Sequence, residues 1–184
     1  GSLLWLLDRT ATAMGGRLLK KWLDKPLLNR QAIEERLSAV ETFVNDMLLT
    51  KEVQDILKNV YDLERLAGRI ACGSANARDL VALKRTLEVL PSLKNTLQRT
   101  NASISHFIAS PDLCKDMSGM IDEALVDDPP VSVKEGGLIR SGYHAELDKL
   151  LTAKHEGKAW VVRLEQEERE KTGIKSLKVG YNRV

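Results

Sequence analysis

The longest stretch of the sequence that favours a single unbroken helix covers residues 144–171. It contains no proline, and apolar side chains such as Leu147, Leu151 and Trp160 recur along its first part. At about 1.5 Å per residue this helix would be on the order of 40 Å long, which is more than a globular core of this size requires. Residues 165–171 contain no apolar side chain. We therefore expect a helix that packs at its base and projects from the body at its far end.

Composition limits the class of protein. A chain of 184 residues forms one large domain or two small ones. Its hydrophobic content of 43% and charged content of 29% are ordinary for a soluble globular protein, and a net charge of +2 does not by itself indicate a nucleic-acid binder. No apolar run approaches the roughly 18 residues of a membrane span, and no signal peptide is visible. The widely separated Cys72 and Cys114 favour thiols in a reducing compartment, so we expect a cytoplasmic protein without a membrane partner.

Helical patterns in the first two thirds of the chain are bounded by residues that begin or end helices. Asn29 is expected to cap one helix, and Gly73 is expected to end another. The next helix is expected to start at Ser74 or Asn76 and to be interrupted by Pro91.

The predicted fold class is all-α, with a multi-helix core, a long projecting lever helix and a short C-terminal β segment. We place the core in residues 1–140 and the helix with the β segment in residues 141–184. The connecting residues 127–143 are rich in proline, glycine and serine, and a short hairpin is expected around Gly136 and Gly137. Its strands would contain Val131, Val133, Leu138 and Ile139. Eight apolar side chains at helical spacing are expected to be largely buried: Leu18, Trp22, Ile33, Leu37, Leu63, Leu66, Leu80 and Leu83.

The end of the chain has the period-two pattern of a strand with one exposed face. Leu177, Val179 and Tyr181 alternate with lysine, glycine and asparagine. A strand over residues 177–184 would need a partner for its backbone N–H and C=O groups, and the rest of the sequence supplies no obvious one.

A charge asymmetry separates this terminus from the helix before it. Residues 165–170 contain four glutamates and one arginine, whereas residues 171–184 contain no acid. The cations of the second stretch are Lys171, Lys175, Lys178 and Arg183. Two interpretations remain open on physical grounds: a cationic tip that contacts a polyanion, or lysines that keep an edge strand from pairing. The four glutamates favour a solvated helix face over an acidic binding patch.

No catalytic signature is present. The sequence lacks a phosphate-binding loop, a dinucleotide-binding fingerprint, a zinc-protease motif and a nucleophile elbow. His106, His144 and His155 are scattered and do not predict a metal site. Cys72 and Cys114 are interpreted as buried apolar fillers. We therefore expect neither catalysis nor a bound metal or cofactor in this chain.

Three stretches carry a family resemblance. DRTATAMGGRLLKKWLDKPL (residues 8–27), YDLERLAGRIACGSANARDLVALKRTL (residues 61–87) and EGGLIRSGYHAELDKL (residues 135–150) resemble, in this order and at these spacings, the central region of bacterial MutS proteins. The pattern DLERL, then ARDL, is long and specific, and the resemblance covers nearly all of residues 3–184.

The resemblance implies a division of labour. In this family an N-terminal domain probes DNA mismatches, a C-terminal ATPase binds ATP and Mg²⁺, and an all-α core with a lever connects them. KVGYNRV would begin a small β-rich clamp, so Lys175, Lys178, Asn182 and Arg183 are the expected contacts with the backbone of double-stranded DNA. The expectation is that the mismatch-probing domain, the nucleotide site and the returning lever helix lie outside this sequence. A homodimer and a MutL-like repair partner are implied for the parent protein.

The leading interpretation is a non-catalytic structural and DNA-clamping segment of a MutS-like mismatch repair protein. The alternative is a helical protein–protein interaction or dimerisation module of a MutS paralogue that does not act on mismatches. Salt-dependent DNA binding would favour the first interpretation, and dimerisation without DNA binding would favour the second.

Overall fold

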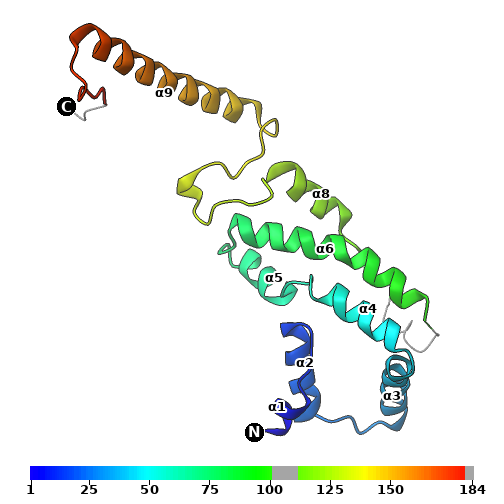
Figure 1. Ribbon diagram of the computed structural model, residues 1–184. Helices are drawn as coiled ribbons and strands as arrows, with labels where there is room; N and C mark the ends of the chain where they lie inside the picture. Colours follow the sequence, from blue (N-terminus) through cyan, green and yellow to red (C-terminus); the bar gives the residue numbers. More distant parts are fainter. Residues whose placement is uncertain (101–111, 181–184) are drawn as a thin grey trace. The chain divides into compact units, whose positions relative to one another are not determined.

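The computed structural model describes residues 1–100 and 112–180 (Figure 1). Contacts within the chain define two compact units, Gly1–Ile139 and Arg140–Val184, and each is considered by itself. The described residues form helices and turns, with one isolated β-bridge and no sheet. The predicted all-α class is therefore confirmed.

The first unit contains most of the helices. They are α1 (Leu3–Leu7), α2 (Ala13–Asp24), α3 (Arg30–Asn45), α4 (Met47–Leu57), α5 (Leu63–Ala71), α6 (Ala77–Gln98) and α8 (Lys115–Ala124), followed by the short 3-10 helix η1 (Val133–Glu135). The second unit is built on α9 (Ala145–Thr172).

Side-chain caps explain where many of these helices start. An N-cap side chain accepts a hydrogen bond from the backbone N–H three residues later at Thr12, Asn29, Asp46, Asp62 and Asn76. Asn76 also forms a reciprocal capping box with Asp79, because each side chain accepts from the other residue's backbone N–H. The predicted starts at Asn29 and Asn76 are confirmed. The predicted stop at Gly73 is confirmed too, since this glycine has the positive φ of 65° that is common just beyond a helix end.

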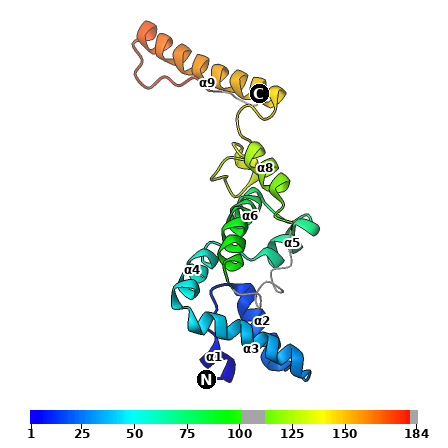
Figure 2. The same cartoon turned by 90° about the vertical axis from the view of Figure 1, so that its right-hand side faces the viewer.

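The expected interruption at Pro91 is wrong, because α6 continues through it from Ala77 to Gln98. A proline inside a helix removes the hydrogen bond to the carbonyl four residues earlier, here that of Leu87. Helix α6 nevertheless has buried side chains on both sides of the proline, including Thr86 and Thr96, and packs against α4, α5 and α8 (Figures 1 and 2). Tertiary packing on several faces outweighs one missing backbone bond.

The best-defined part of the core lies between α6 and α8. Val81, Ile121 and Leu125 are buried together, and Leu80 and Leu83 of α6 pack against them half-buried. Leu66 of the expected core set is buried, as predicted, and Leu63 is half-buried. The first unit is thus held together mainly through α6.

Half of the expected core set is exposed, so that part of the prediction is wrong. Leu18, Trp22, Ile33 and Leu37 lie on α2 and α3, and their exposed fractions range from 36% to 61%. These two helices do have apolar stripes, but a stripe shows which face is apolar and not whether another element covers it. Trp22 is partly shielded by Arg36, whose guanidinium carbon lies 3.6 Å from the ring centroid.

Residues 127–143 do not form the expected hairpin. Val133 belongs to η1 and is exposed, as is Val131, whereas Ile139 forms an isolated antiparallel bridge with Leu125 at the end of α8. The backbone N–H of Val126 donates to the carbonyl of Leu138 at 3.0 Å. The second half of the expected hairpin therefore pairs with the chain that follows α8 rather than with its own first half. Arginines of α6 bind carbonyls of residues 127–129 and hold this segment against the helix.

A single arginine ties α2 to the start of α5. Arg17 donates through Nη1 and Nη2 to the two carboxylate oxygens of Asp62, at 2.8 and 2.7 Å, and through Nε to Glu64 at 2.8 Å. The hydrogen bonds from Arg17 lower the pKa of Asp62 from 3.8 to about 2, with a further contribution from the backbone N–H of Arg65. The same contacts raise the pKa of Arg17.

The ion pair between Arg17 and Asp62 makes the free energy of unfolding depend on pH over a defined acidic range. Because the folded-state pKa of Asp62 is depressed, its contribution is fully present above about pH 4 and is lost as the pH falls to about 2. In an Arg17→Met variant the pKa of Asp62 should rise towards 3.8, and the stability difference from wild type should disappear below pH 2. Carboxyl-carbon NMR titration measures this. The pKa of Asp55, which Lys58 lowers, is the internal control and should not change.

Candidate functional site

The second unit begins with the long helix that the sequence predicts. Helix α9 spans Ala145–Thr172, in agreement with the expectation of residues 144–171. His144 caps its start by accepting a hydrogen bond from the N–H of Leu147 at 3.3 Å. Gly173, with φ of 70°, ends it in the left-handed conformation, and its N–H donates to the carbonyl of Arg169 at 2.9 Å.

After Gly173 the chain reverses direction. The N–H of Leu177 donates to the carbonyl of Ile174 at 3.2 Å, which closes a tight turn with Lys175 and Ser176 at its centre. Residues 174–180, hereafter the terminal segment, then run back beside the end of α9 (Figure 2).

Two side chains of α9 hold the terminal segment in place. Arg169 donates through Nε to the carbonyl of Leu177 at 2.7 Å. Glu165 accepts through Oε2 from the backbone N–H of Val179 at 3.1 Å. The two side chains are also joined to each other, since Arg169 Nη2 donates to Glu165 Oε1. We call this arrangement the Glu165–Arg169 clasp.

The clasp leaves the lysines of the terminal segment exposed. Lys175 and Lys178 have exposed side chains, and neither forms an ion pair with any residue of the described chain. Lys171 differs, because it binds Glu168 at 2.9 Å and this hydrogen bond raises its pKa. Of the four residues expected to contact DNA, Lys175 and Lys178 are thus brought together on one short segment. The other two, Asn182 and Arg183, lie outside the described residues.

Comparison with known protein families decides what kind of chain this is. The family described as MutS domain III matches residues 1–178, which include both units except the last few residues. The chain belongs to the MutS family. Among curated relatives, it is 58% identical to the DNA mismatch repair protein MutS of Brevibacillus brevis and 50% identical to that of Alkaliphilus oremlandii. Both alignments cover 100% of this chain, but 22% and 21% of the relatives. The chain therefore spans about a fifth of the length of these MutS proteins.

The strand expected at the start of the MutS clamp is not formed over residues 177–180. Leu177 and Val179 are half-buried and Lys178 and Gly180 exposed, so the predicted alternation of faces is present. Among the described residues the segment has no neighbouring strand, and side chains of α9 bind its backbone instead. Tyr181 and the remainder of the expected strand lie outside the described residues.

The far end of α9 is not bare, contrary to expectation. Glu165, Glu168 and Arg169 are half-buried, because the terminal segment returns over this part of the helix. The prediction that the four glutamates form a fully solvated helix face is thus only partly correct. An open apolar hollow of about 670 Å³ lies between residues 154–162 of α9 and the end of the terminal segment. Its lining includes Trp160 and Val179, and Trp160 remains 64% exposed.

Sequence reasoning missed the clasp. The spacing of Glu165 and Arg169, four residues apart on a helix, is the only signal that the sequence contains. That spacing predicts an ion pair on the helix surface. It does not predict that the pair binds the backbone of a later segment, which depends on the chain reversal at Gly173.

The two cysteines lie in different surroundings. Cys72 is exposed at the end of α5, so its predicted burial is wrong: the residue lies just beyond the last turn of a helix that faces solvent there. Cys114 is half-buried. Over residues 1–100 and 112–180, no group of three or more His, Cys, Asp or Glu side chains could hold a metal ion. His106 lies outside the described residues. No helix in the described ranges is both long and apolar enough to span a membrane.

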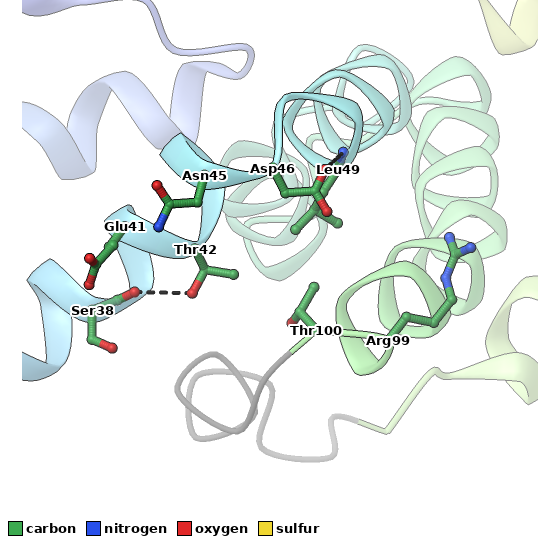
Figure 3. Close-up of a pocket in the computed structure, with 8 residues that line it drawn as sticks. All are labelled: Ser38, Glu41, Thr42, Asn45, Asp46, Leu49, Arg99 and Thr100. Carbon is green, nitrogen blue, oxygen red and sulfur yellow. Dashed lines mark hydrogen bonds between the residues drawn. The ribbon is translucent and has the colours of Figure 1, made fainter.

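A polar hollow of about 400 Å³ occurs in the first unit (Figure 3). Ser38, Thr42 and Asp46 line one side, where Thr42 donates to the carbonyl of Ser38 at 3.1 Å. Arg99 borders the other side, but its guanidinium is bound to Glu52 at 2.6 Å. Thr100 also lines the hollow and directly precedes residues 101–111, which are outside the described ranges, so we assign no ligand to it.

Proposed function

We propose that this chain is a non-catalytic structural segment of a MutS-type mismatch repair protein, which links the mismatch-binding and ATPase parts and contacts the DNA backbone through its terminal segment. One observation carries the proposal. In a chain that belongs to the MutS family, Lys175 and Lys178 lie exposed, without an ion-pair partner among the described residues, on a segment that α9 holds in place.

The physical properties of α9 and the lysines suit this role. A long helix resists bending because each turn is hydrogen-bonded to the next, so a displacement at one end is transmitted to the other. Lysine contacts to phosphates position a protein on double-stranded DNA without reading its sequence. Binding of ATP and Mg²⁺, the pairing of two copies and the recruitment of a MutL-like partner are assigned by this proposal to the longer cytoplasmic protein and not to residues of this chain.

Charge reversal of the two lysines tests the proposal. Fluorescence anisotropy of labelled duplex DNA should show weak binding by the 184-residue chain, equal for matched and mismatched duplexes. The affinity should fall steeply with salt, because phosphates that a protein neutralises release their counterions. A variant with Lys175→Glu and Lys178→Glu should have at least about tenfold lower affinity for the duplex. The slope of its affinity against salt concentration should also fall by about the share of two phosphate contacts.

The control is Lys20→Glu with Lys21→Glu on α2, which makes the same change in net charge in the other unit. Both residues are exposed and neither is ion-paired within the described residues. Equal losses in the two variants would mean that only net charge matters, and the proposed site would be wrong. A clear preference for mismatched DNA would equally contradict a segment that contacts only the backbone.

The alternative function, a protein–protein interaction module, is favoured by one observation. Trp160 and Val162, two residues apart on α9, are 64% and 65% exposed, and both border the open apolar hollow beside the terminal segment. Light scattering across a range of protein concentrations separates the two functions. Concentration-dependent dimerisation without any binding of DNA would favour the alternative.

A further inference from the structure

We infer that Glu165 and Arg169 act as a side-chain substitute for a neighbouring strand, which sets the register of the terminal segment on α9 and so positions Lys175 and Lys178. The setting of the register stands on the geometry of the clasp alone. The role of the clasp in presenting the lysines to phosphates rests on the proposed function.

The clasp matches the backbone of an extended chain in both spacing and chemistry. In a strand, the C=O of one residue and the N–H of the residue two positions later project from the same edge. Arg169 supplies a donor to the C=O of Leu177, and Glu165 supplies an acceptor to the N–H of Val179. Four residues of helix rise about 6 Å. The C=O of one strand residue and the N–H two positions later lie about 4–5 Å apart, since they enclose four of the six backbone bonds in a two-residue repeat of about 6.6 Å. Side chains one turn apart on α9 therefore span slightly more than this separation, and they lean towards each other to reach both backbone groups.

The order of the contacts also fits. The residue later in α9, Arg169, binds the earlier residue of the terminal segment, and Glu165 binds the later one, as required when the segment runs back along the helix. The bond between the two side chains fixes their orientation, since each uses one atom for its partner and another for the backbone.

The register decides which side chains face outwards. With the clasp in place, Leu177 and Val179 are half-buried and Lys178 is exposed. A slip by one residue would exchange the two faces, which would turn the lysine towards the helix and the apolar side chains towards solvent. The clasp thus selects the arrangement in which Lys178 can reach a phosphate.

An ordinary surface ion pair would not have this effect, and the same helical turn contains one for comparison. Glu168 and Lys171 pair at 2.9 Å, but within the described residues neither side chain binds the backbone of the terminal segment. Exposed pairs of this kind contribute little to structure. The backbone hydrogen bonds are what distinguish the clasp.

Amide hydrogen exchange in the 184-residue chain, followed by NMR, tests the register. Glu165→Ala should speed exchange at Val179 about tenfold, because a hydrogen bond to a charged acceptor is lost. Glu165→Gln keeps one acceptor oxygen where the carboxylate has two, so it should restore part of the protection. The control Glu168→Ala should leave exchange at Val179 unchanged. Equal exchange in Glu165→Ala and wild type would overturn the inference.

A charge swap distinguishes two explanations for the protection: hydrogen bonds from the clasp to the backbone edge of the terminal segment, and the ion pair between residues 165 and 169 by itself. The variant Glu165→Arg with Arg169→Glu keeps the ion pair and the net charge, but places a donor at the N–H of Val179 and an acceptor at the carbonyl of Leu177. We expect it to exchange as fast as Glu165→Ala. Protection equal to wild type would overturn the inference, because the pair alone would then suffice.

The swap variant also tests the positioning of the lysines, since its net charge equals that of wild type. Its affinity for duplex DNA should fall about three- to tenfold, which charge alone would not cause. Unchanged affinity, when the variant with Lys175→Glu and Lys178→Glu does lose affinity, would overturn the positioning role. If that lysine variant also binds normally, the proposed function fails, whereas the register is still decided by the exchange at Val179.

Discussion

Replacement of Ile121 with alanine is expected to lower the free energy of unfolding of the first unit by about 2–4 kcal/mol. Ile121 is 8% exposed and lies with Val81 and Leu125 in the cluster between α6 and α8. The shorter side chain loses buried methyl groups and leaves a cavity, which the surrounding helices fill only in part. The loss should be large because α6 and α8 share the most extensive contact between helices among the described residues. Urea unfolding followed by circular dichroism measures it.

The matched control is the preceding residue. Met120 lies on the same turn of α8 but is 65% exposed, so Met120→Ala should change the free energy of unfolding by less than about 0.5 kcal/mol. A similar cost for the two substitutions would show that the α6–α8 cluster is not the core of the first unit.

The helix starts could be predicted because they depend on neighbouring residues. Asn29 and Asn76 each bind a backbone N–H three residues ahead, so the information lies within one turn of the chain. The fate of Pro91 could not be predicted in this way. Its local effect is unfavourable, and it is tolerated because α6 packs against three other helices.

Burial was predictable only where a second element could be foreseen. Leu66 and Leu37 have similar positions in apolar stripes, yet the first is 7% and the second 61% exposed. Each of the two helices packs on a neighbour, α5 on α6 and α3 on α4, so the difference lies in which residues of each stripe that neighbour covers. Which stripe is covered depends on contacts between residues far apart in the sequence, and periodicity contains no information about these.

In the candidate site, too, the features that depend on neighbouring residues could be predicted, and those that depend on distant contacts could not. The absence of acids after Glu170 marks Lys175 and Lys178 directly in the sequence, and the structure places both on one exposed segment. The contacts that hold the segment could not be predicted, because they involve the backbone carbonyl of Leu177 and the backbone N–H of Val179. Nearly every residue has these two groups, so the sequence does not mark them as binding partners. A strand pattern indicates that a backbone needs a partner, but not that side chains of a helix will provide it.

The second large effect concerns Thr86, the most buried residue of α6. Its side chain is fully buried, its Oγ1 donates to the carbonyl of Ala82 at 2.9 Å, and the same oxygen accepts from the backbone N–H of Tyr61 at 3.0 Å. Tyr61 lies in the connection between α4 and α5, so this hydroxyl joins that connection to α6. Thr86→Val keeps the shape of the side chain but leaves the N–H of Tyr61 without its acceptor. We expect a loss of about 1–3 kcal/mol in urea unfolding.

Thr96, the other buried threonine of α6, provides the comparison that isolates the cause. It is 2% exposed, and its Oγ1 donates to Glu52 at 2.8 Å and accepts from Nη2 of the exposed Arg99 at 3.2 Å. After Thr96→Val the Glu52 carboxylate, which is 47% exposed, keeps its contact with Arg99 and can bind water, so the cost should stay below about 1 kcal/mol. The two substitutions remove the same atom from equally buried sites on one helix. They differ in whether the group left behind can find another partner, and equal losses would show that burial of the hydroxyl, rather than the stranded N–H of Tyr61, sets the cost.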